Sequence, residues 1–411
     1  MEKEKVLDIV LNEQYFSIKD LRFNAQLGYM LSKDELNSFL ETKDSFVEEN
    51  NKYFSKLPLK SFNSKHVFFV VGNYLENAID EYVTTLNEDL KQNEKFFLER
   101  HIDDIMTSRL FSEIEGTLNI ENVPTTHKKV QNVINTDNLS DKNDIIVKNM
   151  FNAIKYIVKE RPQFNRENLF KLYSTLSNNC LDEEDRLNDG YYRDDSVSIG
   201  PYDGAPHEKI EELMDSMFAF ANDSENVKKY KHFLPHICHY YVLYVHPYFD
   251  YNGRTARMVS FWLACLNNLV AAPFFISEAI NEDKRAYYDA VSNTRDTNND
   301  LTYFLGYIFE TSTKFSLIYK NVEEIENRLN KSGDFLSPSE KTYIKKILVH
   351  NADGYFNSKK FMEYINGTMT KQGALKILNG LTRYGVLETS TNKKGEKIYR
   401  VNQEMITYKY N

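Results

Sequence analysis

Hydrophobic residues recur every three or four positions along most of this chain, which is the spacing of helices that bury one face. The stretch FFLERHIDDIMTSRLFSEI shows this spacing within a long helical region over residues 66–120. The same spacing appears in further segments: 142–160, 165–178, 206–221, 226–245, 254–269, 283–293, 300–316 and 319–330. The pattern therefore predicts a mostly α-helical protein.

A strand-like pattern interrupts the helices in GYYRDDSVSIGPYDG, residues 190–204. Val197 and Ile199 alternate with serines, Ser198 among them, and a glycine stands on either side of the run. Alternation bounded by turn residues predicts a small hairpin or an extended flap.

Glycine, serine and proline cluster in NKSGDFLSPSE, residues 330–340, where we expect a break between domains. Beyond it the pattern predicts helices at 339–350, 358–365 and 370–384, and then two strands in VLETSTNKKGEKIYRV. Three helices followed by a hairpin is the order of a winged helix. The expected division is a helical region over 1–94, a central domain over 95–330 and a winged-helix domain over 337–411.

Charge separates these parts. The 411 residues carry a net charge of −9, which argues against a chain that binds nucleic acid over its whole surface. Residues 338–400 nevertheless contain twelve Lys and Arg against five Asp and Glu. A local contact of the winged helix with DNA or with a protein therefore stays open.

Three features predict a cytoplasmic protein without a membrane contact. MEKEKVLDIVL carries charges where an export signal needs an apolar run. The most apolar stretch, 259–276, contains Asn267, Asn268 and Pro273, whereas a membrane-spanning helix needs about 20 apolar residues. The three cysteines are odd in number and lie in apolar helical segments, which is typical of reduced core residues.

Candidate chemistry gathers in HPYFDYNGRTAR, residues 246–257. Pro247 cannot continue the preceding helix, so the chain turns into a loop. Asn252-Gly253 is a turn dipeptide, and the next helix begins near Arg254. A loop that leads into a helix N-terminus collects free amides and positive dipole, which together favour an anion.

The charged residues of this stretch suit a phosphate compound. Arg254 and Arg257 share one helix face and could hold neighbouring phosphates. Asp250 offers an oxygen ligand for Mg²⁺. His246 titrates near neutrality and could accept a proton from a hydroxyl group. Any one of these residues alone is typical of an ordinary helix–loop–helix turn, but their combined spacing favours phosphoryl or nucleotidyl transfer.

The stretch resembles the signature of Fic-domain proteins, H-x-F-x-D/E-G-N-G-R-x-x-R. The matching residues are His246, Asp250, Asn252, Gly253, Arg254 and Arg257. Tyr248 replaces the Phe, and Tyr251 replaces the first Gly, whose amide holds phosphates in the family. Tyr251 keeps an amide but resists the positive φ that glycine adopts freely.

The resemblance implies a Fic helical core that transfers AMP from ATP and Mg²⁺ to a hydroxyl side chain of a protein, including itself. His246 would be the general base and Asp250 the metal ligand. The phosphate cradle would comprise Tyr251, Asn252, Gly253, Arg254 and Arg257. The flap of Val197, Ser198 and Ile199 would align the target segment. Tyr287 would pack near the adenine, with a place in the core as the alternative.

Many members of this family carry an inhibitory helix with the pattern S/T-x-x-x-E-G/N. FSEIEG, residues 111–116, offers Glu115 before Gly116, with Phe111 in the Ser/Thr place. If Glu115 paired with Arg257, ATP would bind unproductively. The alternative is an ordinary glutamate before a glycine that caps the helix.

Other functions remain open. Transfer of UMP, phosphocholine or phosphate is one alternative, although the intact Asn-Gly-Arg favours AMP. A DNA-binding regulator with a nucleotide-sensing Fic domain is another. His236 and His239 have a metal-ligand spacing, but no third ligand is placed by the sequence, which favours core histidines.

Overall fold

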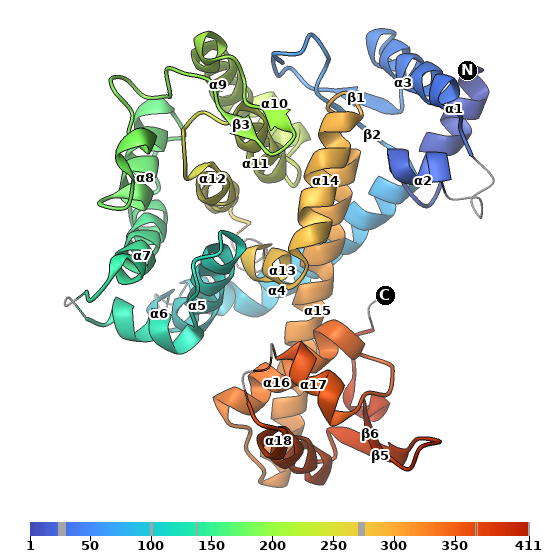
Figure 1. The fold of residues 1–411 in the computed structure, drawn as a ribbon, viewed down its shortest axis with the longest axis vertical. Helices are drawn as coiled ribbons and strands as arrows, with labels where there is room; N and C mark the ends of the chain where they lie inside the picture. The colour runs from blue at the N-terminus through green and yellow to red at the C-terminus, as the bar shows by residue number, and fades with distance from the viewer. Residues whose placement is uncertain are drawn as a thin grey trace. The chain divides into compact units, whose positions relative to one another are not determined.

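The computed structural model describes residues 1–23, 30–98, 102–136, 139–269, 276–365, 367 and 369–409. The chain divides into two compact units, Met1–Ser312 and Thr313–Asn411. Helices make up most of each unit, and each unit also contains short antiparallel strand pairs or a single such pair (Figure 1). The predicted mostly α-helical class is confirmed.

The first unit begins with its own small hydrophobic cluster. Its elements are α1 (Lys3–Val10), α2 (Ile18–Phe23), α3 (Lys33–Glu48), β1 (Phe54–Lys56) and β2 (Phe68–Val70). A buried ion pair between Lys43 and Asp300 fastens this region to a distant part of the chain, and the Tyr15 hydroxyl donates to Asp300 over 2.6 Å. The region predicted as helical over 1–94 thus lies within the first unit and also contains a strand pair, β1 and β2.

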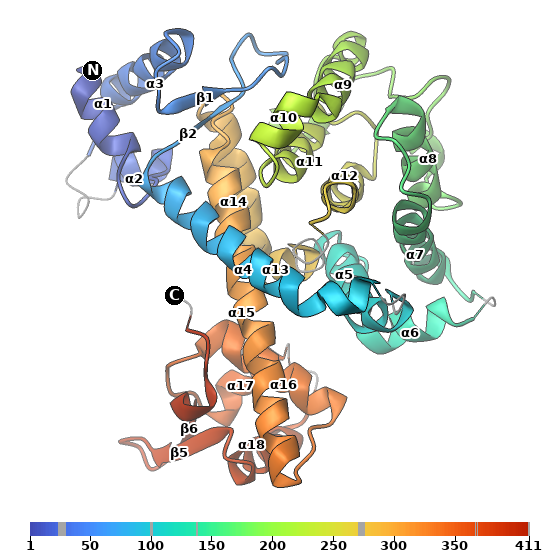
Figure 2. The same cartoon turned by 180° about the vertical axis from the view of Figure 1, so that it is seen from behind.

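The helical core occupies the rest of the first unit, which also carries the small hairpin of β3 (Ser198–Ile199) and β4 (Tyr202–Asp203), and the last helix, α15, continues into the second unit. Its helices are α4 (Asn73–Leu98), α5 (Ile102–Ile120), α6 (His127–Ile134), α7 (Lys142–Glu160), α8 (Arg166–Ser177), α9 (His207–Asn222), α10 (Ser224–Lys229), α11 (Leu234–Val245), α12 (Asn252–Leu266), α13 (Ile276–Glu282), α14 (Lys284–Asp296) and α15 (Thr302–Ser332). In both views α12 lies among α5, α7, α8 and α11, and it contacts each of them (Figures 1 and 2).

The predicted helices differ from the structure most clearly at three places, of which the first is residues 68–70, predicted as helix, which form β2. The segment 226–245 forms two helices, because Pro235 lies at the first turn of α11 and is best accommodated at a helix start. Segments 300–316 and 319–330 form the single helix α15, since no proline or glycine interrupts the chain between them. None of the helices in the described ranges combines the length and apolarity needed to cross a bilayer.

The second unit has the predicted element order. It contains α16 (Pro338–Asn351), α17 (Ser358–Tyr364), α18 (Lys371–Arg383), β5 (Leu387–Thr391) and β6 (Lys397–Val401). The strands pair antiparallel, with Leu387 opposite Val401. The unit begins at Thr313, before the predicted break, because Ile318 and Ile325 on α15 belong to its hydrophobic cluster.

Candidate active site

His246 ends helix α11, which is buried over nearly its whole length. The residue adopts a left-handed conformation with φ of 54°, its amide donates to the Val242 carbonyl over 2.9 Å, and Pro247 prevents further helix. Burial lowers the pKa of His246 to about 4, and the charges of Arg193 and Arg295 act in the same direction. The imidazole is therefore neutral at pH 7 and able to accept a proton.

The loop after His246 is closed by Asn252. The Asn252 side chain accepts a hydrogen bond from the Tyr248 amide over 3.0 Å and donates one to the Tyr248 carbonyl over 2.7 Å. The Tyr248 ring is buried and stacks on Tyr173 with centroids 3.7 Å apart. The Asn252 side chain thus braces the loop, and only its backbone is left for the predicted phosphate cradle.

Tyr251 takes up the positive φ that the sequence made questionable. Its φ is 66°, and it precedes the first residue of α12. The Arg254 guanidinium lies 3.4 Å from the centroid of the Tyr251 ring, and both residues are buried. This cation–π contact and the burial of the ring offset the cost of a left-handed tyrosine. The Arg254 Nε has no hydrogen-bond partner among the described residues.

Asp250 lies at the open side of the loop, with its side chain 49% exposed. One carboxylate oxygen accepts from the Tyr251 amide over 2.5 Å, and the other lies 3.5 Å from an Arg254 nitrogen. The carboxylate is therefore oriented by its neighbours and reachable from solvent.

Arg257 lies on the next turn of α12 and is 1% exposed. Its Nε donates to the Thr117 hydroxyl over 2.8 Å, and a terminal nitrogen lies 2.7 Å from the Glu121 carboxylate. Burial alone would raise the pKa of Glu121, but Arg257 and Arg254 hold it below its usual value. Glu121 is thus a carboxylate at neutral pH.

The Glu121 carboxylate also lies against the start of α12. An ideal Cβ built on Gly253 would approach the Glu121 Oε1 to 2.5 Å. A larger residue at this position would push the carboxylate away, so the glycine permits this close approach, and the N-terminus of a helix favours negative charge. Glu121 therefore lies at the place that the sequence predicted for a phosphate.

A comparison with known families agrees with this geometry. The model of the Fic/DOC family matches residues 163–264, which run from the start of α8 through the motif loop into α12. The chain contains a Fic domain.

Solved structures similar to the chain include three with Fic descriptions. A Fic family protein from Desulfovibrio desulfuricans G20 is 18% identical, with a TM-score of 0.49 over 79% of this chain and 96% of that one. A fragment of Fic-1 from C. elegans is 18% identical, with a TM-score of 0.44 over 60% of this chain and 72% of that one. A Fic domain containing signaling protein from Bacteroides thetaiotaomicron VPI-5482 is 16% identical, with a TM-score of 0.40 over 59% of this chain and 94% of that one.

The glutamate that pairs with Arg257 in the structure is Glu121, where the sequence predicted Glu115. Helix α5 continues for four residues beyond Gly116 to Ile120, so Gly116 is no cap. A Cβ on Gly116 would lie 2.6 Å from the Glu278 amide nitrogen, so this glycine permits the close approach of α13. The stretch TLNIEN, residues 117–122, satisfies the family's S/T-x-x-x-E-G/N pattern at every defined position, so the sequence also contains a signal for Glu121.

The flap of the Fic domain forms where the alternation predicted it. Ser198 pairs with Asp203 and Ile199 with Tyr202, while the Val197 carbonyl accepts from the Gly204 amide over 2.9 Å. A Cβ on Gly204 would lie 3.4 Å from the His246 Cβ. The base of the flap is therefore adjacent to the candidate general base.

Tyr287 is a core residue, and the structure does not support its predicted contact with the adenine. The ring is 1% exposed and its hydroxyl lies 3.0 Å from His239 Nε2. His236 lies within 3.3 Å of Ser260 and is also buried, which agrees with the interpretation of both histidines as core residues. The adjacent Tyr288 is 48% exposed. Burial raises the pKa of its hydroxyl, and the charges of Glu121 and Arg257 also influence that pKa.

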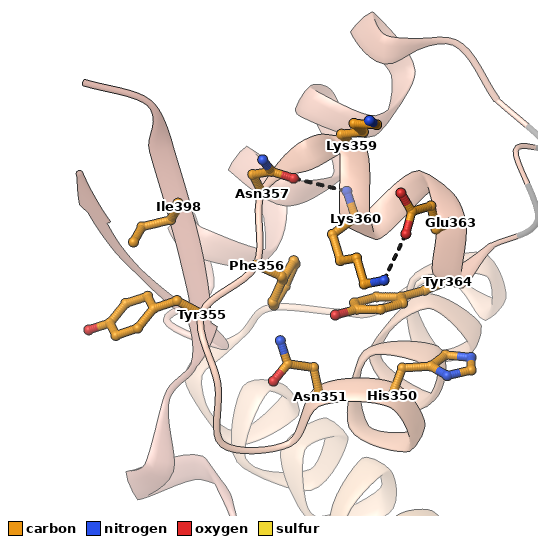
Figure 3. A pocket seen from close by; sticks show the side chains of 10 residues that line it. All are labelled: His350, Asn351, Tyr355, Phe356, Asn357, Lys359, Lys360, Glu363, Tyr364 and Ile398. Carbon is orange, nitrogen blue, oxygen red and sulfur yellow. Dashed lines mark hydrogen bonds and ion pairs between the residues drawn. The ribbon is translucent and has the colours of Figure 1, made fainter. Parts of the chain in front are cut away.

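A hollow of the second unit offers different chemistry. His350 and Tyr364 stack beside it with centroids 5.1 Å apart, and the Lys360 ammonium lies 2.8 Å from Glu363 (Figure 3). The Lys360 ammonium at this hollow is thus already paired, and Lys359 also lines the hollow. The hollow lies within α16, α17 and β6 and contains no residue of the Fic motif.

Proposed function

We propose that this protein transfers AMP from ATP to a hydroxyl side chain of a protein and releases pyrophosphate. The observation that carries the proposal is the carboxylate of Glu121 at the N-terminus of α12, paired with Arg257 and next to the loop of His246. A site that holds one anion there is suited to hold the phosphates of a nucleotide.

His246 is the base in this proposal. Its lowered pKa keeps the imidazole neutral, so it can take the proton of the acceptor hydroxyl as that oxygen attacks the α-phosphorus. The bond from the α-phosphorus to the bridging oxygen breaks, and pyrophosphate leaves with the electron pair. Arg254 lies where it can bind phosphate oxygens through its unpartnered Nε.

Mg²⁺ would be held by Asp250, and the residues present fit it. The ion usually binds through one or two carboxylates together with substrate phosphates and water. Asp250 supplies one oriented and exposed carboxylate. Among the described residues no cluster of three His, Cys, Asp or Glu could form a metal site, so substrate oxygens would complete the coordination. The ion would neutralise phosphate charge.

Glu121 restrains the reaction in this proposal. For contact with the adenine of ATP, Tyr288 is a better candidate than Tyr287. While Glu121 holds Arg257, that arginine is not available to the γ-phosphate, and the carboxylate repels a phosphate at the same helix end. Release of Glu121 would make Arg257 available to the γ-phosphate and would clear the helix N-terminus for a phosphate.

Intact-mass analysis tests the transferred group. Wild type and Glu121→Gly are incubated with Mg²⁺ and one donor at a time: ATP, UTP or CDP-choline. A mass gain of one AMP on the protein, with ATP only, is the expected result. A mass gain of UMP, phosphocholine or phosphate would show that this group, and not AMP, is transferred. No mass gain in either protein would contradict self-modification.

A second candidate function rests on the second unit. Basic side chains are exposed on α18 and on the turn between β5 and β6: Lys371, Lys376, Arg383, Lys393 and Lys394. Such a surface suits phosphates of DNA. Binding of the full chain to a duplex at several salt concentrations tests it, because a steep salt slope marks phosphate contacts, and a shallow one would favour a protein partner instead.

A further inference from the structure

Both ends of the flap and the loop of His246 meet at one buried guanidinium. Arg193 is 2% exposed, and its Nε donates to the His246 carbonyl over 2.8 Å. Its two terminal nitrogens donate to the carbonyls of Asp195 and Ala205. Asp195 precedes β3 and Ala205 follows β4, so a single side chain joins the entry and the exit of the flap to the candidate general base.

Backbone hydrogen bonds reinforce the same junction. The Arg193 amide donates to the Pro247 carbonyl over 3.0 Å, and the Ala205 amide donates to the Val245 carbonyl over 3.1 Å. The residues before and after His246 are therefore bonded to the chain at either end of the flap. The side chain of Arg193 adds a hydrogen bond to His246 itself, through the His246 carbonyl.

The chemistry of the junction requires an arginine. No carboxylate lies within ion-pair distance of Arg193 in the described ranges, and its charge is satisfied by three carbonyl oxygens. A guanidinium presents its donors in a fixed planar fork, whereas a lysine ammonium is a single flexible centre. Three carbonyls in different directions match the fork and not the point charge.

A small residue is also needed beside the fork. An ideal Cβ on Gly204 would lie 2.7 Å from a terminal nitrogen of Arg193 and 2.8 Å from the Val197 side chain. An alanine at this position would therefore displace the guanidinium while leaving its charge unchanged.

We propose that Arg193 is a positioning residue that sets the distance and angle between the flap and His246, so that an acceptor aligned on the flap presents its hydroxyl to the imidazole. This inference rests on the proposed transfer for its kinetic part. Its structural part, the attachment of the flap through Arg193, can be measured without any transfer.

The test compares wild type with Arg193→Gln, Arg193→Lys and Gly204→Ala, all in the Glu121→Gly background. The probe is α-labelled ATP, with the protein itself as acceptor. We expect transfer to fall about 100-fold in all three, because small misplacements of reacting groups have effects of that size. Calorimetry should give unchanged ATP affinity and stoichiometry, which shows that the folded fraction has not changed.

Hydrogen exchange supplies the readout that does not depend on transfer. Amides of residues 197–204 should exchange about tenfold faster in the three variants, since charge-assisted hydrogen bonds at the flap ends are lost. Arg186→Gln is the matched control, because Arg186 lies exposed in the same segment, and it should alter neither readout. If Arg193→Gln does not fold, Gly204→Ala decides alone.

The outcomes separate the two proposals. Unchanged flap exchange in folded variants overturns the role of Arg193. Faster exchange with undiminished transfer also overturns it, because the flap would then be loosened without consequence for His246. Absence of transfer in the Glu121→Gly parent contradicts the proposed function, and faster exchange would still support the attachment of the flap.

Discussion

Positive charge is held in opposite ways in two regions of this molecule. In the Fic domain Arg193, Arg254 and Arg257 are buried, and each lies against particular carbonyls, a tyrosine ring or a carboxylate. In the second unit Lys376 and Lys393 are exposed to solvent. A buried charge is costly unless its partners are well placed, whereas an exposed charge costs little and acts over a longer range. Buried arginines such as these therefore fix the geometry around them, whereas exposed lysines such as these two contribute only a general attraction to negative charge.

In the Fic domain, replacement of His246 should give the largest effect on transfer. Because its imidazole is the neutral base of the motif, His246→Ala in the Glu121→Gly background should lower transfer by about 10² to 10⁴. Affinity for ATP should stay within a few fold, since Arg254 and the helix N-terminus remain. Incorporation of α-labelled ATP and calorimetry measure the two quantities. Transfer at more than a few per cent of the parent rate would remove His246 from its role.

Glu113 makes the stability of the first unit depend on pH. Burial raises its pKa to about 7, although the hydrogen bonds from Ser277 and the charge of Arg257 oppose this. The group is protonated in the folded state below that pH and must carry a buried charge above it. Stability is therefore full below about pH 4.5 and falls as pH rises through 7, by on the order of 3 kcal/mol.

Glu113→Gln removes this part of the pH dependence. Urea unfolding at pH 5 and pH 8 should show a smaller difference between the two pH values in the variant than in wild type. An equal difference in both proteins would mean that Glu113 does not titrate in this range.

Glu121 and Glu115 provide a matched pair near the end of α5. Glu121→Gly should raise self-modification by an order of magnitude or more, because a charge-assisted contact of about 1.5–3 kcal/mol no longer competes with ATP. Glu115→Gly should have no such effect, since Arg257 pairs with Glu121. Rates of label incorporation decide between them. Activation by Glu115→Gly alone would restore the prediction made from sequence.

Asp250→Ala should abolish the effect of Mg²⁺ on ATP affinity. Its carboxylate is the metal ligand of the proposal, so ATP should bind at least about tenfold more weakly in the presence of Mg²⁺ than it binds to wild type. Calorimetry with and without the ion measures this, and Asp185→Asn serves as the control. A preserved metal dependence would assign the ion to another carboxylate.

Lysines of the second unit should give the smallest effects. Lys376→Gln should change the free energy of unfolding by no more than about 0.5 kcal/mol, because the side chain is exposed. If α18 contacts DNA, the same change should reduce the slope of log K against log salt by about 0.9. Lys360→Gln, at a lysine already paired with Glu363, is the control for that slope. Equal slopes in both variants would exclude α18 from the contact.

The sequence was informative where function depends on neighbours in the chain. His246, Asp250 and the two arginines of the motif lie within twelve residues, so helix end, loop and helix start could be inferred from Pro247 and the Asn-Gly turn. The flap followed from alternation and glycines alone. Helix α7 lies at its predicted residues, 142–160, because Asp141 caps it and apolar residues follow at helical spacing.

Contacts between distant residues were not available to the sequence. Glu121 could have been found from TLNIEN, but the preceding FSEIEG also offers a glutamate before a glycine, and the packing of the helices decides which glutamate faces Arg257. Tyr287 and Tyr288 are adjacent, and their burial depends on the packing of α14 against the core. Nothing in the run GYYRDDSVSIG distinguishes Arg193 from a solvated arginine.

The sequence by itself thus determined the chemical groups of the site, because a short motif carries its own backbone geometry through proline, glycine and helix ends. Only the tertiary structure decided which charges are buried and what they touch. Arg193 and Arg257 bind atoms that are up to 53 and 140 residues away in the chain. Such pairings depend on how helices pack against one another, and that packing is a property of the whole core rather than of any segment.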